Sequence, residues 1–162
     1  MADVCVVNAS PLIFLGATGK LDLLRLVAPR VLVPSSVPAE VRARGSTDPV
    51  AAAVDAASWL EHRPSTSSSP DAVLAWDLGG GESAVITLAL ESPGAVAILD
   101  DLPARRCAAS LGIPVAGTLG IVLLARKAGR LPAARPMLED LRNRGMWLSD
   151  RVLNTVLKEI GE

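Results

Sequence analysis

Apolar residues along this chain fall in short unbroken runs instead of alternating with polar residues. Val4–Val7 is the first such run, and three of the four later strand candidates share its character. A strand that is apolar at every position is buried on both faces, which is typical of a parallel sheet covered by helices. The predicted strands are Val4–Val7, Val31–Val33, Trp59–His62, Val96–Leu99 and Ile113–Ala116.

Helix start and stop signals separate these strands. Ser10-Pro11, Ser35-Ser36 and Asp48-Pro49 resemble helix openings, and Gly45 and Gly112 resemble helix ends. The predicted helices are Pro11 to about Leu26 (interrupted near Gly16–Gly19), Val37–Arg44, Pro49–Ala57, Glu82–Leu90, Leu102–Leu111, Thr118–Ala128, Ala134–Arg144 and Asp150–Ile160. This alternation predicts one α/β domain over residues 1–162, with a central, mostly parallel sheet between two helical layers. The polar stretch Arg63–Pro70 is expected to be a surface loop.

Composition narrows the function classes. Half of the 162 residues are hydrophobic and 20% are charged, which excludes an intrinsically disordered chain. Aromatic residues make up 2%, namely Phe14, Trp59, Trp76 and Trp147. This scarcity argues against a binding module that stacks bases on aromatic platforms.

Charge is balanced overall but unevenly distributed. The formal net charge is −1, yet residues 1–100 carry 11 acidic and 6 basic side chains, whereas residues 101–151 carry 4 and 9. An acidic half beside a basic half is compatible with a metal site next to a polyanion-binding face. Chance is the simpler explanation of the counts alone.

The cysteines and the single histidine carry no recognisable site. Cys5 and Cys107 lie in apolar surroundings without a C-x-x-C pair, so we expect buried, reduced thiols in a cytoplasmic protein. His62 is expected to be a solvated residue at a strand end.

One uncharged stretch has the length of a membrane span. Cys107–Ala125 contains 19 residues, but Gly112–Pro114 and Gly117–Gly120 divide it into a helix end, a short strand and a helix start. We therefore predict no membrane span. The N-terminus lacks the basic region of a signal peptide, so none is expected.

Several residues that could bind a ligand lie directly after predicted strands. Ligands of parallel sheets bind at the carboxyl ends of the strands, and Asn8, Asp100-Asp101 and Gly117-Thr118 all follow strands directly. Glu40 and Glu82 lie early in helices. Such hard oxygen ligands suit Mg²⁺ or Mn²⁺, and a metal ion placed there can polarise a scissile phosphate.

Each of these residues also has a purely structural interpretation. Asp101 is a good N-cap, Glu82 is favoured by the helix dipole, Glu40 suits a solvated face and Asn8 suits a turn. Known phosphate motifs are missing from the sequence, because no G-x-x-x-x-G-K-[ST] occurs and no strand precedes Gly79-Gly80-Gly81. A phosphotransfer or signalling domain also lacks its expected lysine beside Gly117-Thr118.

An ordered set of motifs carries a family resemblance. The motifs are Val6–Leu12, Val33–Val41, Gly81-Glu82 with Ala84 and Ala89, Leu99–Asp101 with Arg105 and Ala108, and Gly117–Gly120. In this order and spacing, from about Val4 to Leu124, the chain resembles PIN-domain proteins of the branch related to VapC-like toxin nucleases.

The resemblance implies a PIN-like three-layer fold and a Mg²⁺- or Mn²⁺-dependent endonuclease acting on single-stranded RNA. It also implies a homodimer neutralised by a small antitoxin protein. The acidic site of the family falls on Asn8, Glu40, Glu82 and Asp100, with Asp101 adjacent and Ser10 matching a small hydroxyl.

The roles we expect follow from these matches. Glu40, Glu82 and Asp100 would be catalytic and hold the metal, Asn8 would be a neutral ligand, and Asp101 a supporting or capping residue. The basic candidates for RNA phosphates are Arg105, Arg106, Arg126 and Lys127, and Ser10 is a further candidate for binding the nucleic acid.

Two further expectations concern activity and partners. The family usually has Asp where this chain has Asn8, so metal affinity should fall, and the alternative function is a weakly active or inactive PIN-fold module that binds RNA or protein.

The C-terminal helices carry more apolar residues than a peripheral hairpin needs, so part of their surface should pack on a second copy or an antitoxin. These residues are Leu138, Leu141, Met146, Trp147, Val152, Val156 and Ile160.

Overall fold

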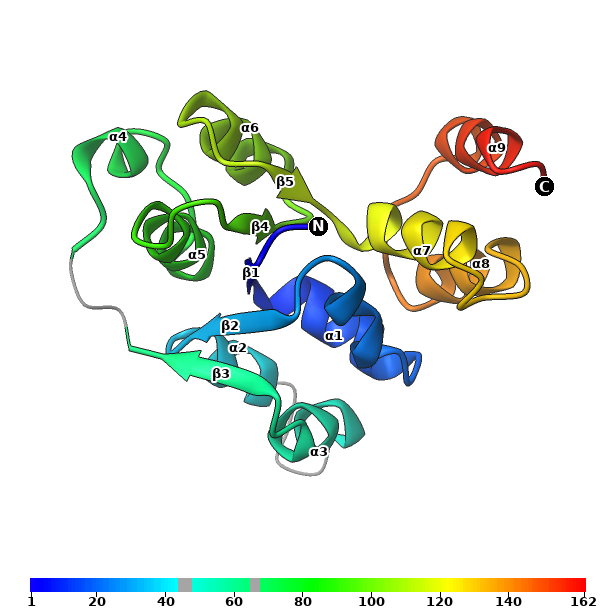
Figure 1. Cartoon of the computed structure of the whole chain (residues 1–162), viewed down its shortest axis with the longest axis horizontal. Helices are drawn as coiled ribbons and strands as arrows, with labels where there is room; N and C mark the ends of the chain where they lie inside the picture. Colours follow the sequence, from blue (N-terminus) through cyan, green and yellow to red (C-terminus); the bar gives the residue numbers. More distant parts are fainter. Residues whose placement is uncertain (44–47, 65–67) are drawn as a thin grey trace.

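The computed structural model describes residues 1–43, 48–64 and 68–162, and within them one parallel sheet lies at the centre (Figure 1). Its strand order is β3-β2-β1-β4-β5, and every pairing is parallel. The strands are β1 (Val4–Val7), β2 (Arg30–Pro34), β3 (Leu60–Arg63), β4 (Val96–Ile98) and β5 (Val115–Ala116). The predicted α/β class with a parallel sheet is confirmed.

Helices cover both faces of this sheet. Helix α5 packs against β1, β2 and β4, whereas α1 packs with α2, α3 and α7 on the other side (Figure 1). The helical elements are α1 (Ala9–Ala17), η1 (Leu21–Leu26), α2 (Val37–Arg42), α3 (Pro49–Ala56), α4 (Asp71–Leu74), α5 (Gly80–Leu90), α6 (Leu102–Ser110), α7 (Thr118–Lys127), α8 (Arg135–Asn143) and α9 (Asp150–Glu159).

The order of the strands reverses once. From β1 the chain moves outward to β2 and β3, then returns across the sheet to place β4 on the other side of β1. The connection that follows β1 runs toward β2, whereas the connection that follows β4 runs in the opposite direction, toward β5. The carboxyl ends of β1 and β4 therefore border a natural crevice. Asn8 and Asp100 follow these two strands.

Aliphatic side chains form the core. Cys5, Val6 and Val7 of β1 are fully buried, as are Ile98 on β4 and Ile86 on α5. Both cysteines are free and buried, as predicted, and burial raises the pKa of the Cys5 thiol to about 12. His62 is exposed on β3, in agreement with its expected role.

Several element boundaries differ from the prediction. Helix α1 begins at Ala9 with Asn8 as its N-cap residue, so Ser10 does not open it. Helix α5 begins before the predicted Glu82, since Gly79 is its N-cap residue and Gly80 and Gly81 lie inside the helix. Helix α4 was not expected, since a single turn is too short to show a helical period. The predicted helix end at Arg44-Gly45 and the middle of the loop Arg63–Pro70 lie outside the described residues.

The uncharged stretch Cys107–Ala125 is divided as the glycines predict. It contributes to α6, β5 and α7 instead of one long helix. Within the described part of the chain, no helix has both the length and the apolar character needed to cross a bilayer.

Glu162 fixes the beginning of α8 from a distance. Its carboxylate accepts hydrogen bonds from the backbone N–H of Ala134 (2.8 Å) and Arg135 (3.0 Å) and from Nε of Arg126 (2.7 Å). These donors lower the pKa of the Glu162 carboxyl to about 2. The negative charge also complements the positive end of the α8 dipole.

We expect Glu162→Gln to lower the melting temperature in a pH-dependent way. The carboxyl has a lower pKa in the folded state, so its stabilisation is complete above about pH 4.5 and disappears as the pH falls toward 2. Thermal denaturation of both proteins between pH 2 and 7 measures this difference. Glu159→Gln, on the exposed surface of α9, is the matched control. A Glu162→Gln effect that is constant over this pH range would contradict the assignment.

Candidate functional site

Asn8 connects β1 to the acidic side chains. Its backbone forms the N-cap of α1, while its side chain, 3% exposed, turns away from that helix and donates from Nδ2 to Oε1 of Glu82 at 3.0 Å. Its Oδ1 is buried and has no hydrogen-bond partner within the described part of the structure. A buried acceptor without a partner is costly, so this oxygen is suited to a ligand.

Gly81 provides the space in which Glu40 reaches Asn8. A Cβ built on Gly81 would stand 3.0 Å from Oδ1 of Asn8 and even closer to Oε1 of Glu40. Both oxygens therefore lie against the bare backbone of Gly81, in the first turn of α5. Glu82, the next residue, presents its carboxylate to the same Asn8 side chain.

Glu40 and Glu82 repel each other. Partial burial and the negative charge of Glu82 raise the pKa of the Glu40 carboxyl above its ordinary value. A cation between the two carboxylates would relieve this crowding. Perturbed carboxyl groups of this kind are common at functional sites.

Asp100 is held by residues of two other elements. The backbone N–H of Thr118 donates to its Oδ1 at 2.7 Å, the Thr118 hydroxyl donates to its Oδ2 at 2.7 Å, and the Ser10 hydroxyl donates to Oδ2 at 3.3 Å. Thr118 is fully buried, so these donors are fixed. The sequence did not reveal this role of Thr118, although the residue follows a predicted strand.

Arg105 approaches Asp100 across Gly117. Its guanidinium donates to the backbone carbonyl of Leu99 at 2.9 Å. A Cβ on Gly117 would stand 2.6 Å from an Nη of Arg105 and 3.0 Å from Oδ1 of Asp100, so glycine permits this approach. A cation is thereby positioned at the carboxyl end of β4.

Asp101 performs the capping role that the sequence offered as its alternative. Its Oδ2 accepts from the backbone N–H of Ala104 at 3.0 Å, which caps α6. Its side chain also lines the cavity formed by the other acidic residues.

Two adjoining cavities contain the predicted site. The larger, about 980 Å³, is lined by Asn8, Ser10, Glu82, Asp100, Asp101 and Arg105, and it extends to α7 and the segment before α9. The smaller, about 350 Å³, is lined by Asn8, Ser10, Glu40, Glu82 and Arg144. Asn8, Ser10 and Glu82 border both cavities. Arg144 is a basic residue that the sequence analysis missed, because its distance along the chain gives no sign of its proximity.

The donor set fits a hard divalent cation. Among the described residues, no three His, Cys, Asp or Glu side chains stand close enough to form a metal site by themselves. Mg²⁺, however, is commonly bound by one or two carboxylates and several waters. Glu40, Glu82 and the unpartnered Oδ1 of Asn8 provide two carboxylates and one neutral oxygen.

The other predicted basic residues lie away from these cavities. Arg106 is exposed on α6. Arg126 forms an ion pair with Glu162, and Lys127 ends α7, whose first residue is Thr118. The helical rise places Arg126 and Lys127 about 12 to 13 Å along the axis from Thr118, at the opposite end of α7.

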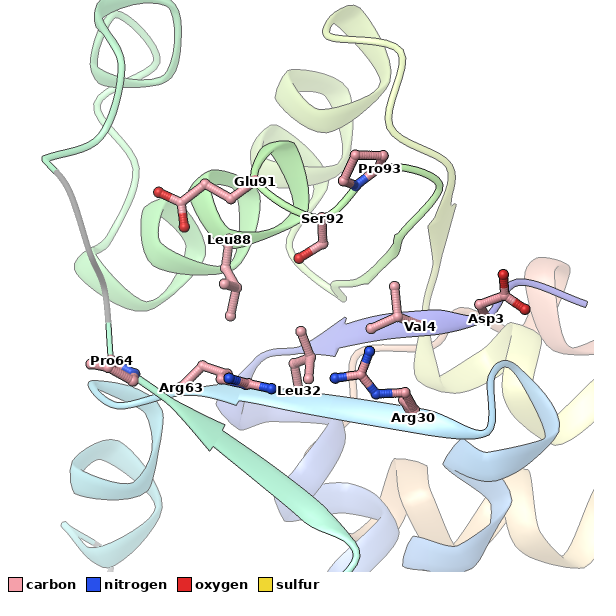
Figure 2. Close-up of a pocket in the computed structure, with 10 residues that line it drawn as sticks. All are labelled: Asp3, Val4, Arg30, Leu32, Arg63, Pro64, Leu88, Glu91, Ser92 and Pro93. Carbon is pink, nitrogen blue, oxygen red and sulfur yellow. The ribbon is translucent and has the colours of Figure 1, made fainter.

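A separate hollow lies between α5 and the β1–β2 part of the sheet (Figure 2). It measures about 480 Å³, and Arg30 and Arg63 point across Leu32 from its floor (Figure 2). Both arginines pair with Glu61, at 2.8 and 3.2 Å. The single negative charge of Glu61 is thus shared between two arginines. The described lining of this hollow holds no group of carboxylates comparable to Glu40, Glu82 and Asp100.

Comparison with known proteins agrees with this geometry. No curated protein matches the chain. A family model described as DUF3368, PIN domain, matches residues 4–162. PIN domains are a nuclease-type fold, and they are generally metal-dependent nucleases that use divalent ions. Because the match covers nearly the whole chain, this protein belongs to the PIN-domain family.

Proposed function

We propose that this protein is a Mg²⁺- or Mn²⁺-dependent endonuclease of toxin type that cleaves single-stranded RNA. The observation that carries the proposal is the unpartnered, buried Oδ1 of Asn8 beside the carboxylates of Glu40 and Glu82. Such a group of oxygens in a cavity is suited to a metal ion and to a phosphate next to it.

The residues of the chain have separate roles in this proposal. Glu40, Glu82 and Asn8 hold the metal ion, which when bound polarises the scissile phosphate and lowers the pKa of a bound water. Asp100, fixed by Thr118 and Ser10, orients the attacking water and accepts its proton. Arg105 offers positive charge to the phosphate, and Asp101 maintains the start of α6.

One observation supports a second candidate, a PIN-fold module that binds RNA or protein without cutting it. The neutral Asn8 amide donates to Glu82 and thereby occupies one of its carboxylate oxygens without any metal. A binding module needs the cavity but not the cation. The two candidates differ in whether metal addition leads to cleavage.

Protein partners complete the toxin-type proposal. We expect a homodimer and a small antitoxin. Leu138, Leu141 and Leu157 are fully buried by their own chain, while Trp147 is 87% and Val152 37% exposed. The C-terminal helices therefore offer a partner less apolar surface than the sequence indicated. Light scattering, alone and with a co-expressed partner, measures the assembly.

Cleavage of a mixed set of single-stranded RNAs tests the nuclease directly. We expect cleavage with Mn²⁺ or Mg²⁺, none with EDTA, and a loss of at least about 100-fold in Glu82→Gln, which removes a charge from the metal site. Glu91→Gln, on the exposed surface beyond the end of α5, is the control. Cleavage that persists in EDTA, or that Glu82→Gln retains, would contradict the mechanism.

Asn8→Asp should destabilise the protein without metal and should strengthen its binding of Mn²⁺. The substitution replaces the Nδ2 donor with a carboxylate that faces Glu82, so the apo protein should lose about 1–3 kcal/mol of unfolding free energy. The added anion should tighten Mn²⁺ binding about 10-fold or more, and nuclease activity should rise. Asn154→Asp, exposed on α9, controls for the charge change. Equal Mn²⁺ affinities by calorimetry would remove Asn8 from the site.

Gly81→Ala tests the close approach of the two oxygens. The added methyl group would displace Glu40 and Asn8, so Mn²⁺ affinity should fall about 10-fold or more, with cleavage falling in parallel. Gly80→Ala is the matched control, because its Cβ would meet no atom within 4 Å. That control should gain about 0.5–1 kcal/mol of helix stability. Unchanged Mn²⁺ binding in Gly81→Ala would show that these oxygens do not hold the ion.

A further inference from the structure

Trp147 is an exposed aromatic side chain on the wall of the larger cavity. It is 87% exposed, and it lines the cavity of about 980 Å³ together with Glu82 and Asp100. A tryptophan in water forgoes more apolar burial than almost any other side chain. Its position within the cavity of the acidic residues indicates that a ligand covers it.

Trp76 occupies a corresponding position in another cavity. It is 38% exposed and lines a cavity of about 330 Å³ whose other members include Glu82 and Asp101. The same two carboxylates line the cavity of Trp147. Two of the three tryptophans of the chain therefore border cavities that adjoin at Glu82 and Asp101.

The third tryptophan provides an internal comparison. Trp59 is partly buried, and its ring lies 5.8 Å from the guanidinium of Arg25 in a cation–π contact. It precedes β3, at the edge of the sheet, and lines neither of these cavities. Its ring therefore has a partner within the chain.

We propose that Trp147 and Trp76 stack bases on either side of the scissile phosphate of a single-stranded RNA. The proposal deepens the proposed nuclease function and rests on it for the identity of the substrate. The phosphate would lie near Glu82 and Asp101, where the two cavities adjoin, and the strand would run from one ring to the other. Aromatic rings bind single strands by stacking on the faces of bases, with little dependence on sequence.

The surroundings of Trp147 favour a nucleic acid over a protein partner. The cavity combines its ring with Arg105 and with the carboxylates, a mixture suited to a base joined to a phosphate next to a metal ion. Leu102, 54% exposed, and Val152, 37% exposed, are the other exposed large apolar side chains of that cavity, and they share its wall with carboxylates, which are depleted at the centre of protein interfaces. The scarcity of aromatic residues thus does not exclude base stacking, because two of the few lie at the site.

Binding of a fluorescein-labelled 12-nucleotide single-stranded RNA, measured by anisotropy in EDTA, tests the proposal without cleavage. Trp→Leu keeps apolar bulk but removes the stacking face. We expect Trp147→Leu and Trp76→Leu each to raise Kd roughly 5- to 150-fold. Trp147→Phe should retain most of the affinity, and Trp59→Leu should leave Kd unchanged. An unchanged Kd in Trp147→Leu overturns the proposal.

Fluorescence gives a second measurement that a purely electrostatic contact would not affect. In the Trp59→Phe/Trp76→Phe protein, Trp147 is the remaining tryptophan, and the chain has no tyrosine. RNA should quench its emission, whereas polyphosphate, which has charge but no bases, should not. Equal quenching by both ligands overturns stacking. A dimer that shields Trp147 from acrylamide without RNA assigns the ring to a protein interface and also overturns it.

The outcomes separate this proposal from the nuclease function. If the wild type cleaves RNA but Trp147→Leu binds it equally well, the nuclease stands and the stacking proposal fails. If the wild type does not cleave but Trp147→Leu weakens binding, Trp147 stacks a base in a module that binds RNA without cutting it, and the nuclease proposal fails.

Discussion

The reversal of strand order between β1 and β4 determines where the site lies. Because the chain leaves these neighbouring strands in opposite directions, their carboxyl ends border a crevice that neither crossover closes. Asn8 enters it from β1 and Asp100 from β4, while α5, which crosses the same strands, contributes Glu82. The acidic residues are thus gathered by the topology of the sheet, even though they are far apart along the chain.

The carboxylates of this crevice differ in how far hydrogen bonds compensate their negative charges. Asp100 accepts hydrogen bonds from three donors, which stabilise its negative charge without any ion. Glu82 has the Asn8 amide, but Glu40 faces the charge of Glu82, which raises the pKa of its carboxyl. The side of the cavity around Glu40 is therefore the side that a cation stabilises most, and Asn8 reduces the need for that cation by supplying a neutral donor.

The sequence predicted those features that depend on neighbours along the chain. Apolar runs located the strands to within a residue or two, and Asp101 caps the helix that follows it. The Asn8–Glu82 and Ser10–Asp100 bonds join residues 74 and 90 positions apart, and no local pattern encodes such distances. Ser10 was misplaced as a helix cap for this reason, since its hydroxyl serves Asp100 instead. Nor did the sequence show which apolar residues near the C-terminal helices are exposed, since Leu138, Leu141 and Leu157 are buried while Trp147 is not.

The bond network of Glu162 has a consequence for how this cavity can change. Glu162 holds the start of α8, and the segment after α8 forms the wall that carries Trp147. The carboxylates belong to other parts of the chain, since Glu40 lies on α2, Glu82 on α5, and Asp100 and Asp101 follow β4. The width of the cavity and its chemistry are thus encoded in separate parts of the chain. Substitutions in the C-terminal helices can reshape what the cavity admits while the acidic floor stays the same.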